Sequence, residues 1–189
     1  MKKRISMKRL FIGVGIFANK EVLEFHQKLK NSFTESRISW VRPENMHITL
    51  NFIGDTPEQK IPQIIESLER VGDSSQRFNS QIKSFGIFGR SGNPKVFWLG
   101  TDHEDEWNSL YNKIVRSLPM EEKEENFNAH LTLARIKFFN NDSKALASYI
   151  ENYKTKAFQE VNVHHFQLYQ SMLLPTGPRY SVIREFELK

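Results

Sequence analysis

Apolar positions along the chain follow two different periods, which separate the expected helices from the expected strands. In four segments the apolar residues recur every three or four positions, as they do on one face of an amphipathic helix. These expected helices are Lys20–Phe33, Glu58–Val71, Glu104–Ser117 and Ser143–Tyr153. His26 falls on the apolar side of the first helix, so we interpret it as a helix-face residue rather than a ligand.

The other apolar runs are short and rich in β-branched and aromatic residues, which is typical of strands. The expected strands are Leu10–Phe17, Ile38–Arg42, Met46–Ile53, Phe78–Phe88, Lys95–Thr101, Phe127–Ile136, Phe158–Leu174 and Tyr180–Leu188. Several of them follow one another without an intervening helix. This favours an α+β fold with a mainly antiparallel sheet over a doubly wound parallel fold.

Three polar segments connect the expected elements. Gly89–Pro94 could cradle a phosphate, but no strand-to-helix pattern surrounds it, so a plain hairpin loop is favoured. Pro175–Pro178 is the expected turn before the last strand. The acidic run Glu121–Glu125 is most simply a solvated connector.

The length of 189 residues and the apolar fraction of 39% suit one compact domain, spanning residues 1–189. Residues 1–8 are expected to form a flexible basic tail. The run Leu10–Ala18 behind them imitates a signal peptide, but Gly13 and Gly15 weaken that interpretation and the run equally fits a first buried strand. No apolar stretch approaches the length of a membrane span, so we expect no membrane partner.

Charge and cysteine content narrow the classes of partner. The chain has 27 Lys and Arg against 22 Asp and Glu, a formal net charge of +5, which favours an anionic partner such as a phosphate. Ordinary solubility explains this charge equally well. No cysteine is present, which excludes disulfides, thiolate catalysis and Cys-ligated zinc. A cytoplasmic monomer is the simplest expectation.

One four-residue pattern, His-apolar-Thr-apolar, occurs in each half of the chain, as His47–Leu50 and as His130–Leu133. Side chains alternate across a strand, so each His shares a face with its Thr while the apolar pair faces the core. If the two halves pack around an approximate two-fold axis, the two His-Thr faces meet across a cleft. A lone strand histidine is most simply a partly buried, hydrogen-bonded residue, and it is the duplication that favours a catalytic pair.

Such a pair suits acid–base chemistry on a phosphate ester, without a metal or another cofactor. One neutral imidazole takes a proton from attacking water while the other, protonated, gives a proton to the departing oxygen. Thr49 and Thr132 can donate hydrogen bonds to the phosphate oxygens, and Arg135 is the candidate cation. Because Arg135 lies an odd number of residues from Thr132, a bulge is needed to bring it to the same face.

Other catalytic patterns are missing from the sequence. It contains no HExxH motif, no His-carboxylate ligand spacing, no glycine-rich nucleotide loop and no G-x-S-x-G elbow of a Ser-His-Asp enzyme. His164 and His165 are adjacent, so on a strand they point to opposite faces and do not serve one site.

The two tetrads resemble those of the 2H phosphoesterase superfamily, and specifically the RNA 2′,3′-cyclic phosphodiesterases of the LigT-like or 2′-5′ RNA ligase family. The resemblance runs over nearly the whole chain. Besides the tetrads it includes the segments Arg9–Ile12, Trp40–Asn45, Phe52–Gly54, Phe97–Gly100, Ala134–Arg135, Leu168–Ser171 and Pro175–Tyr180.

The resemblance implies a bilobal fold of duplicated origin, with two mainly antiparallel sheets around a central cleft and helices on the outside. It also implies hydrolysis of the 2′,3′-cyclic phosphate of RNA ends or nucleosides to a 2′-phosphate, with weak reverse ligation by microscopic reversibility. If the roles of the family's two histidines are transferred to this chain, His47 is the proton donor to the 3′-oxygen and His130 is the acceptor that activates water. The substrate-contacting residues are then Thr49, Thr132, Arg135 and Phe52.

Three departures from the family pattern leave alternatives open. Ala129 stands where Pro is common, Asn51 where Lys is frequent, and Glu124–Asn126 replaces a basic residue. These changes reduce the positive charge near the expected cleft, so small cyclic phosphates could suffice as substrates. The alternatives are another 2H activity, on nucleotide-sized cyclic phosphodiesters or 2′,5′-linked oligonucleotides, and a non-catalytic RNA-binding module.

Overall fold

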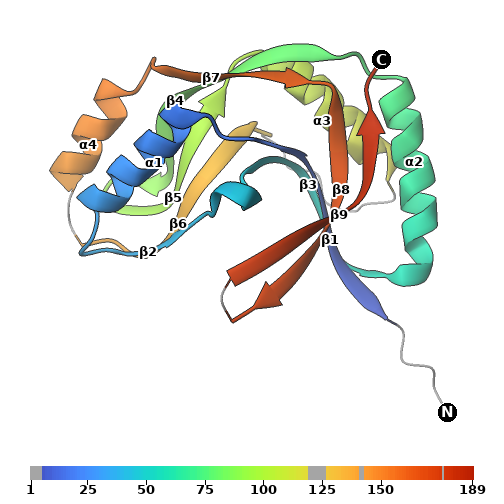
Figure 1. Cartoon of the computed structure of the whole chain (residues 1–189), viewed down its shortest axis with the longest axis horizontal. Coiled ribbons are helices and arrows are strands. Elements are labelled where there is room, and N and C mark those ends of the chain that lie inside the picture. The colour runs from blue at the N-terminus through green and yellow to red at the C-terminus, as the bar shows by residue number, and fades with distance from the viewer. Residues whose placement is uncertain (1–5, 119–126, 141–142, 176) are drawn as a thin grey trace.

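Figure 1 shows the chain as a strongly curled sheet with helices at its two ends. The computed structural model describes residues 6–118, 127–140, 143–175 and 177–189. Its helices are α1 (Lys20–Ser32), α2 (Ile61–Asp73), α3 (Glu104–Ser117) and α4 (Ser143–Asn152), with short 3₁₀ turns η1 (Pro43–Asn45) and η2 (Glu58–Lys60). Its strands are β1 (Met7–Gly15), β2 (Arg37–Trp40), β3 (His47–Pro57), β4 (Phe78–Arg90), β5 (Asn93–Thr101), β6 (His130–Phe138), β7 (Ala157–Val163), β8 (His165–Leu174) and β9 (Gly177–Glu187).

The helices form where apolar residues share one face, and all four expected helices are confirmed. The start of α1 is capped by Asn19, whose side chain accepts a hydrogen bond from the N–H of Val22 at 2.9 Å. The face that α1 buries consists of Val22, Phe25, His26 and Leu29. The helix α2 begins three residues later than expected, because the 3₁₀ turn η2 occupies its expected start.

The described strands form one nine-stranded sheet in the order β7-β4-β5-β6-β3-β1-β8-β9, with β2 paired to β6. Every pairing among them is antiparallel. The strands β3 and β6 meet at the pair Ile48–Leu131, which joins the two halves of the sheet. The α+β class and the mainly antiparallel sheet are therefore confirmed, and the two expected sheets are the two halves of this one sheet.

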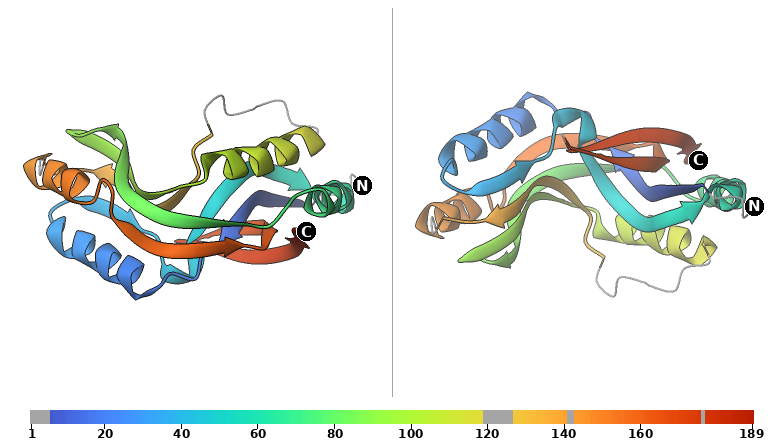
Figure 2. Two further views of the ribbon diagram at one scale, coloured as in Figure 1. Left: turned by 90° about the horizontal axis from the view of Figure 1, so that it is seen from above. Right: turned by 90° about the horizontal axis from the view of Figure 1, so that it is seen from below.

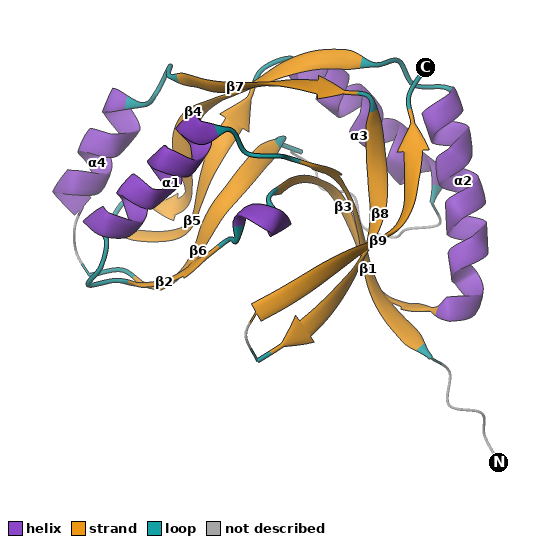
Figure 3. Cartoon of the chain, viewed as in Figure 1, coloured by secondary structure: helices purple, strands orange, loops and turns teal. Residues whose placement is uncertain are grey.

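The helices lie on the outside of the curl as two pairs, as Figures 2 and 3 show. One pair is α1 with α4, which pack against β7 and β4 respectively. The other pair is α2 with α3, which contact each other and the strands β3 and β9. The strands that carry the two His-apolar-Thr-apolar motifs, β3 and β6, lie at the middle of the sheet, away from its ends.

Several boundaries differ from the sequence-based expectations. The first strand starts at Met7, so Met7 and Lys8, which were expected in the tail, pair with Pro57 and Thr56 of β3. It ends at Gly15, before Phe17, which is 97% exposed. Backbone pairing does not require apolar side chains, which is why the pattern misplaced both ends.

Three further expected segments can be compared with the structure. The expected extended stretch 158–174 is two strands, β7 and β8, separated at His164. The segment Gly89–Pro94 is a tight hairpin in which Arg90 pairs with Asn93. The expected acidic connector lies outside the described residues. No helix among the described residues is long and apolar enough to cross a membrane.

Candidate active site

The two His-apolar-Thr-apolar motifs lie side by side on the central strands. Ile48 of β3 pairs with Leu131 of β6, and each is the second residue of its motif. The antiparallel register at this pair sets His47 across from Thr132, and Thr49 across from His130. The apolar motif positions on the other face are buried, with exposures between 0% and 2%: Ile48, Leu50, Leu131 and Leu133.

Each histidine is oriented by the same hydrogen bond. The Nδ1 atom of His47 lies 2.7 Å from the carbonyl of Asn45, and Nδ1 of His130 lies 2.7 Å from the carbonyl of Asn128. A carbonyl only accepts, so Nδ1 carries a proton in both rings. In the neutral ring Nε2 is therefore the atom that can take a proton, and in the charged ring it is one that can give it.

A bulge in β6 brings Arg135 to the same face as His130 and Thr132. Facing β5, Thr132 pairs with Trp98 and Ala134 pairs with Phe97, so Leu133 is an extra residue in the ladder. Past this residue the alternation of side chains is reversed. This is the bulge that the odd spacing of Arg135 requires.

The same irregularity occurs at the equivalent place in β3. Facing β1, Thr49 pairs with Gly13 and Asn51 pairs with Ile12, so Leu50 is the extra residue. As a result Phe52, five residues after His47, shares the face of the first motif, as Arg135 does five residues after His130. The two halves of the site are therefore alike in geometry but carry different groups, a phenyl ring in one and a guanidinium in the other.

The bulged residue Leu133 is held from outside the sheet. Its carbonyl accepts a hydrogen bond from the N–H of Val41 at 2.9 Å and lies 3.2 Å from Nε2 of His26 on α1. Burial, helped by the charge of Lys30, lowers the pKa of His26 from 6.5 to about 4, so its ring is neutral at pH 7. Neutral His26 donates its Nε2–H to this carbonyl. The sequence placed His26 on a helix face but gave no sign of this contact.

A cavity of about 440 Å³ lies over the motif strands. Five of the six residues expected at the site line it: His47, Thr49, Phe52, Thr132 and Arg135. His130 does not line this cavity but packs edge-on against Phe88, with ring centroids 4.8 Å apart. The charge of His130 nevertheless lowers the pKa of His47, so the two imidazoles interact electrostatically.

Aromatic rings surround His47. Its ring centroid lies 4.9 Å from that of Phe11 and 5.3 Å from that of Tyr180. This burial lowers the pKa of His47, and the charges of Arg135 and His130 lower it further, while the hydrogen bond to Asn45 opposes them. These surroundings therefore favour the neutral form of His47.

The two tyrosines near His47 are unsuited to take a proton. Burial, together with the charge of Glu185, raises the pKa of Tyr169 to about 12. Burial also raises the pKa of Tyr180, although Arg135 and Arg9 oppose this. Both phenols therefore stay neutral near pH 7.

Two residues of this site were missed by the sequence reasoning. Tyr180 comes from the distant strand β9; it ends the segment Pro175–Tyr180, which resembles the family, but the resemblance gave it no role. Asn45 had a signal, because Asn stands two residues before the histidine in both motifs, as Asn45 and Asn128. The side chain of Asn45 also donates to the carbonyl of Pro178 at 3.0 Å, which ties the β8–β9 hairpin to the site.

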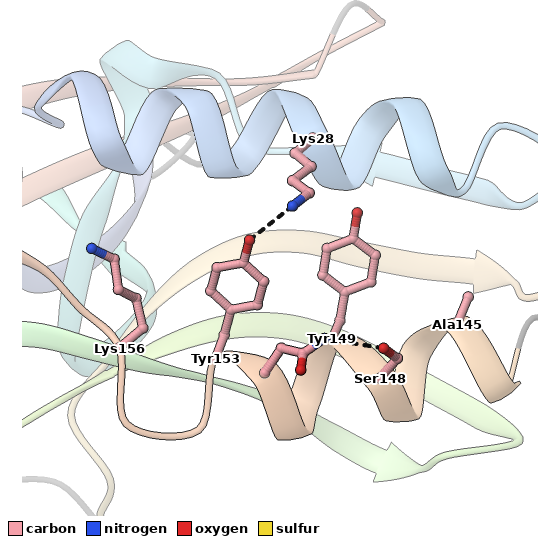
Figure 4. Close-up of a pocket in the computed structure, with 7 residues that line it drawn as sticks. Lys28, Ala145, Ser148, Tyr149, Tyr153 and Lys156 are labelled. Carbon is pink, nitrogen blue, oxygen red and sulfur yellow. Dashed lines mark hydrogen bonds between the residues drawn. The ribbon is translucent and has the colours of Figure 1, made fainter.

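A second cavity, of about 580 Å³, lies between α1 and α4 and is shown in Figure 4. There Lys28 donates a hydrogen bond to the hydroxyl of Tyr153 at 2.9 Å and lies over the rings of Tyr149 and Tyr153. This cavity contains no histidine and lies away from the motif strands. Among the described residues, no group of three or more His, Cys, Asp or Glu could hold a metal ion. The two histidines of the repeated motif lie instead on β3 and β6.

Comparison with known proteins identifies the family of the chain. The family model described as LigT like Phosphoesterase matches residues 16–98 and 101–180. A protein of Thermotoga maritima named RNA 2′,3′-cyclic phosphodiesterase is 36% identical over 186 residues, which cover 96% of each chain. A protein of the same name from Archaeoglobus fulgidus is 34% identical over 185 residues, covering 95% of this chain and 99% of its own.

The fold has a similar counterpart among solved structures. The crystal structure of the protein TT0787 from Thermus thermophilus aligns with a TM-score of 0.70 at 25% identity, covering 95% of this chain and 97% of the other. Sequence, fold and the paired motifs therefore lead to the same assignment. The chain belongs to the LigT-like phosphoesterase family of the 2H superfamily.

Proposed function

We propose that this chain hydrolyses the 2′,3′-cyclic phosphate of RNA ends or nucleosides to a 2′-phosphomonoester, by two-histidine acid–base catalysis without a metal. The observation that carries the proposal is the antiparallel pairing of Ile48 with Leu131, which places two His-Thr pairs side by side. The names of the Thermotoga and Archaeoglobus relatives support the choice of substrate.

The proposed reaction is one in-line displacement at phosphorus. Nε2 of neutral His130 takes a proton from water as the water oxygen bonds to phosphorus. The bond from phosphorus to the 3′-oxygen breaks, and that oxygen takes the proton from Nε2 of charged His47. One P–O bond forms as another breaks, and one proton is taken up by His130 as another leaves His47. The products are the 2′-phosphate and the 3′-hydroxyl.

The phosphate is held by neutral and charged donors. The hydroxyls of Thr49 and Thr132 donate to the non-bridging oxygens, and the guanidinium of Arg135 offsets their negative charge. Neither Arg9 nor Arg135 forms an ion pair with a carboxylate within the described part of the chain. Arg135 is therefore available for an anionic substrate.

The lowered pKa of His47 bears on its role as donor. Before substrate binds, the lowered pKa favours the neutral form, so only part of the enzyme holds the donor proton near pH 7. A bound phosphodiester carries a negative charge that offsets Arg135 and raises the pKa of His47. Substrate binding thus charges the donor before the attacking water gives its proton to His130.

We infer that the active site is made by two lobes of one domain, related by an approximate two-fold axis through the pair Ile48–Leu131. The strand order supports this, because β6-β5-β4 on one side corresponds to β3-β1-β8 on the other. The two bulges, at Leu50 and Leu133, support it further. With a 5′-hydroxyl in place of water, the same displacement joins RNA ends weakly through a 2′,5′ bond.

The test is hydrolysis of adenosine 2′,3′-cyclic phosphate in excess chelator, with the product resolved as the 2′- or 3′-phosphate. We expect turnover that the chelator does not change and the 2′-phosphate as product. A strict metal requirement or a 3′-phosphate product would contradict the mechanism. Tight binding of cyclic-ended RNA without turnover would instead identify a non-catalytic RNA-binding module.

A further inference from the structure

A second guanidinium faces the outer end of the same cavity. Arg9 lies on β1, where it shares a face with Phe11, the residue that contacts the ring of His47. Arg9 lines the cavity together with Ser171, its partner across the β1–β8 ladder. The proposed reaction uses neither of these residues.

The guanidinium of Arg9 is uncompensated. Its register partner on β3 is Asp55, yet no ion pair or hydrogen bond of the Arg9 side chain occurs in residues 6–118 or the other described segments. Its charge acts on Tyr180, as does the charge of Arg135. Two cations thus bracket one tyrosine, Arg135 at the motif end of the cavity and Arg9 at the outer end.

Apolar surface lies beside Arg9 at the mouth of the cavity. Phe52 is 55% exposed and Leu173 is 70% exposed, and both line the cavity. Leu173 belongs to the β8–β9 hairpin, and the bond from Asn45 to Pro178 fixes this hairpin close to His47. Exposed apolar side chains next to a cation suit a nucleobase next to a phosphate.

We propose that the outer end of the cavity is a subsite for the preceding phosphodiester of an RNA end, with Arg9 binding that phosphate and Phe52 and Leu173 contacting a base. This rests on the proposed hydrolysis of a terminal cyclic phosphate. When that phosphate lies against Thr49, Thr132 and Arg135, the rest of the terminal nucleotide extends toward the mouth. In RNA its 5′-oxygen is bonded to the next negatively charged phosphate. In a nucleoside cyclic phosphate the same oxygen belongs to a neutral hydroxyl.

The test compares three substrates that differ only at the 5′-oxygen of the terminal nucleotide. These are adenosine 2′,3′-cyclic phosphate, the same molecule with a 5′-phosphate, and the dinucleotide ApA with a 2′,3′-cyclic end. For the wild type we expect kcat/KM to rise about tenfold with the 5′-phosphate, as one charge-assisted contact gives. The dinucleotide should be at least as good a substrate.

The variant Arg9→Gln should remove most of the gain from the 5′-phosphate, and Arg9→Lys should retain part of it. The matched control is Arg179→Gln, on the same hairpin as Leu173 but outside the lining of the cavity. It should leave the ratio of kcat/KM values between the substrates unchanged. Melting temperatures of all variants should stay near that of the wild type, because both arginines are exposed.

The outcomes separate the subsite from the reaction. Equal kcat/KM for all three substrates in the wild type, or an equal loss for all three in Arg9→Gln, would overturn the subsite while leaving the hydrolysis in place. Failure of the wild type to hydrolyse any of the three would overturn the proposed function itself. A gain in the dinucleotide alone, unaffected by Arg9→Gln, would assign recognition to the base and overturn the role of Arg9.

Discussion

Among the described residues, Ile48 and Leu131 are the pair at which β3 and β6 join, and each holds the second position of its motif. Both side chains are fully buried. An antiparallel pair between equivalent positions puts a local two-fold axis through the site, so each histidine faces the threonine of the other motif. The arrangement of the two motifs depends on this register, because a slip of either strand by one residue would turn the histidine of that strand toward the core.

Loss of either imidazole should abolish the acid–base step. We expect His47→Asn and His130→Asn each to lower kcat by about 100-fold or more, since a positioned general acid or base contributes at least that much. The measurement is turnover of adenosine 2′,3′-cyclic phosphate. The control is His164→Asn, an exposed residue between β7 and β8, which should keep wild-type turnover. Wild-type turnover in either motif variant would contradict the mechanism.

Removing Arg135 should raise the pKa of His47. The positive charge of Arg135 disfavours a second positive charge on the ring, so Arg135→Gln makes protonation easier. Burial remains the larger cause, so the pKa should stay below its ordinary value. An NMR titration of the His47 ring in both proteins measures this shift. An unchanged or lower pKa in Arg135→Gln would show that the two groups do not interact, and Arg179→Gln serves as the control.

The buried ring of His26 should make the protein less stable in mild acid. Its pKa is lowered to about 4 in the fold, whereas the unfolded chain takes up the proton near pH 6.5. Stability is therefore full above about pH 6.5 and falls as the pH drops toward 4, by about 2 kcal/mol at pH 5. Urea unfolding at pH 7.5 and pH 5 measures this loss. In His26→Gln, which does not titrate, the loss between these two pH values should be smaller by that amount.

His26 should also affect the guanidinium that it does not touch. Its hydrogen bond to the carbonyl of Leu133 supports the bulge that presents Arg135. We expect His26→Leu to lower kcat/KM about tenfold, and His26→Gln, which keeps an N–H donor, to lower it less. In a protein that already carries Arg135→Gln, the substitution His26→Leu should cause no further loss of kcat/KM. Equal losses in both backgrounds would reduce His26 to a structural role.

Gly13 should tolerate no side chain. A Cβ atom there would lie 2.7 Å from the carbonyl oxygen of Ile48 and 3.4 Å from Cδ2 of His47. Gly13→Ala should therefore push β3 away and destabilise the fold by about 1 to 3 kcal/mol, with a loss of turnover. Gly92→Ala is the control, since nothing lies within 4 Å of a Cβ at that position. Thermal unfolding and turnover of both variants test this.

Much of the fold could be predicted from the sequence because it rests on local patterns. The α3 boundaries, Glu104–Ser117, match the expectation at both ends, since the apolar stripe and the acidic first turn are both local signals. The start of β1 was missed because Met7 and Lys8 precede the apolar run, although their backbones pair with β3. Chain order likewise says nothing of the pairing between β3 and β6, which brings residues from the two halves of the chain together.

At the site, the alternation of side chains explains His47 and Thr49 but not Phe52. Its inward direction depends on the extra residue Leu50, and bulges of this kind leave no reliable mark in a sequence. Tyr180 was missed for a different reason, because it reaches His47 from a hairpin whose direction depends on tertiary packing. The duplicated motif thus indicates the chemistry, while the walls of the cavity come from the fold.

The different side chains at the two bulges decide how a substrate can enter. A fully symmetric site, with Arg at both positions, would accept the same phosphodiester in two opposite orientations, and either histidine would then serve as the acid. The bulges instead present Phe52 in one half and Arg135 in the other. If the chain acts as proposed, only one orientation brings the anionic oxygens to the cation and the base to the ring. Under the proposed function, this asymmetry fixes the direction in which an RNA end lies across the site.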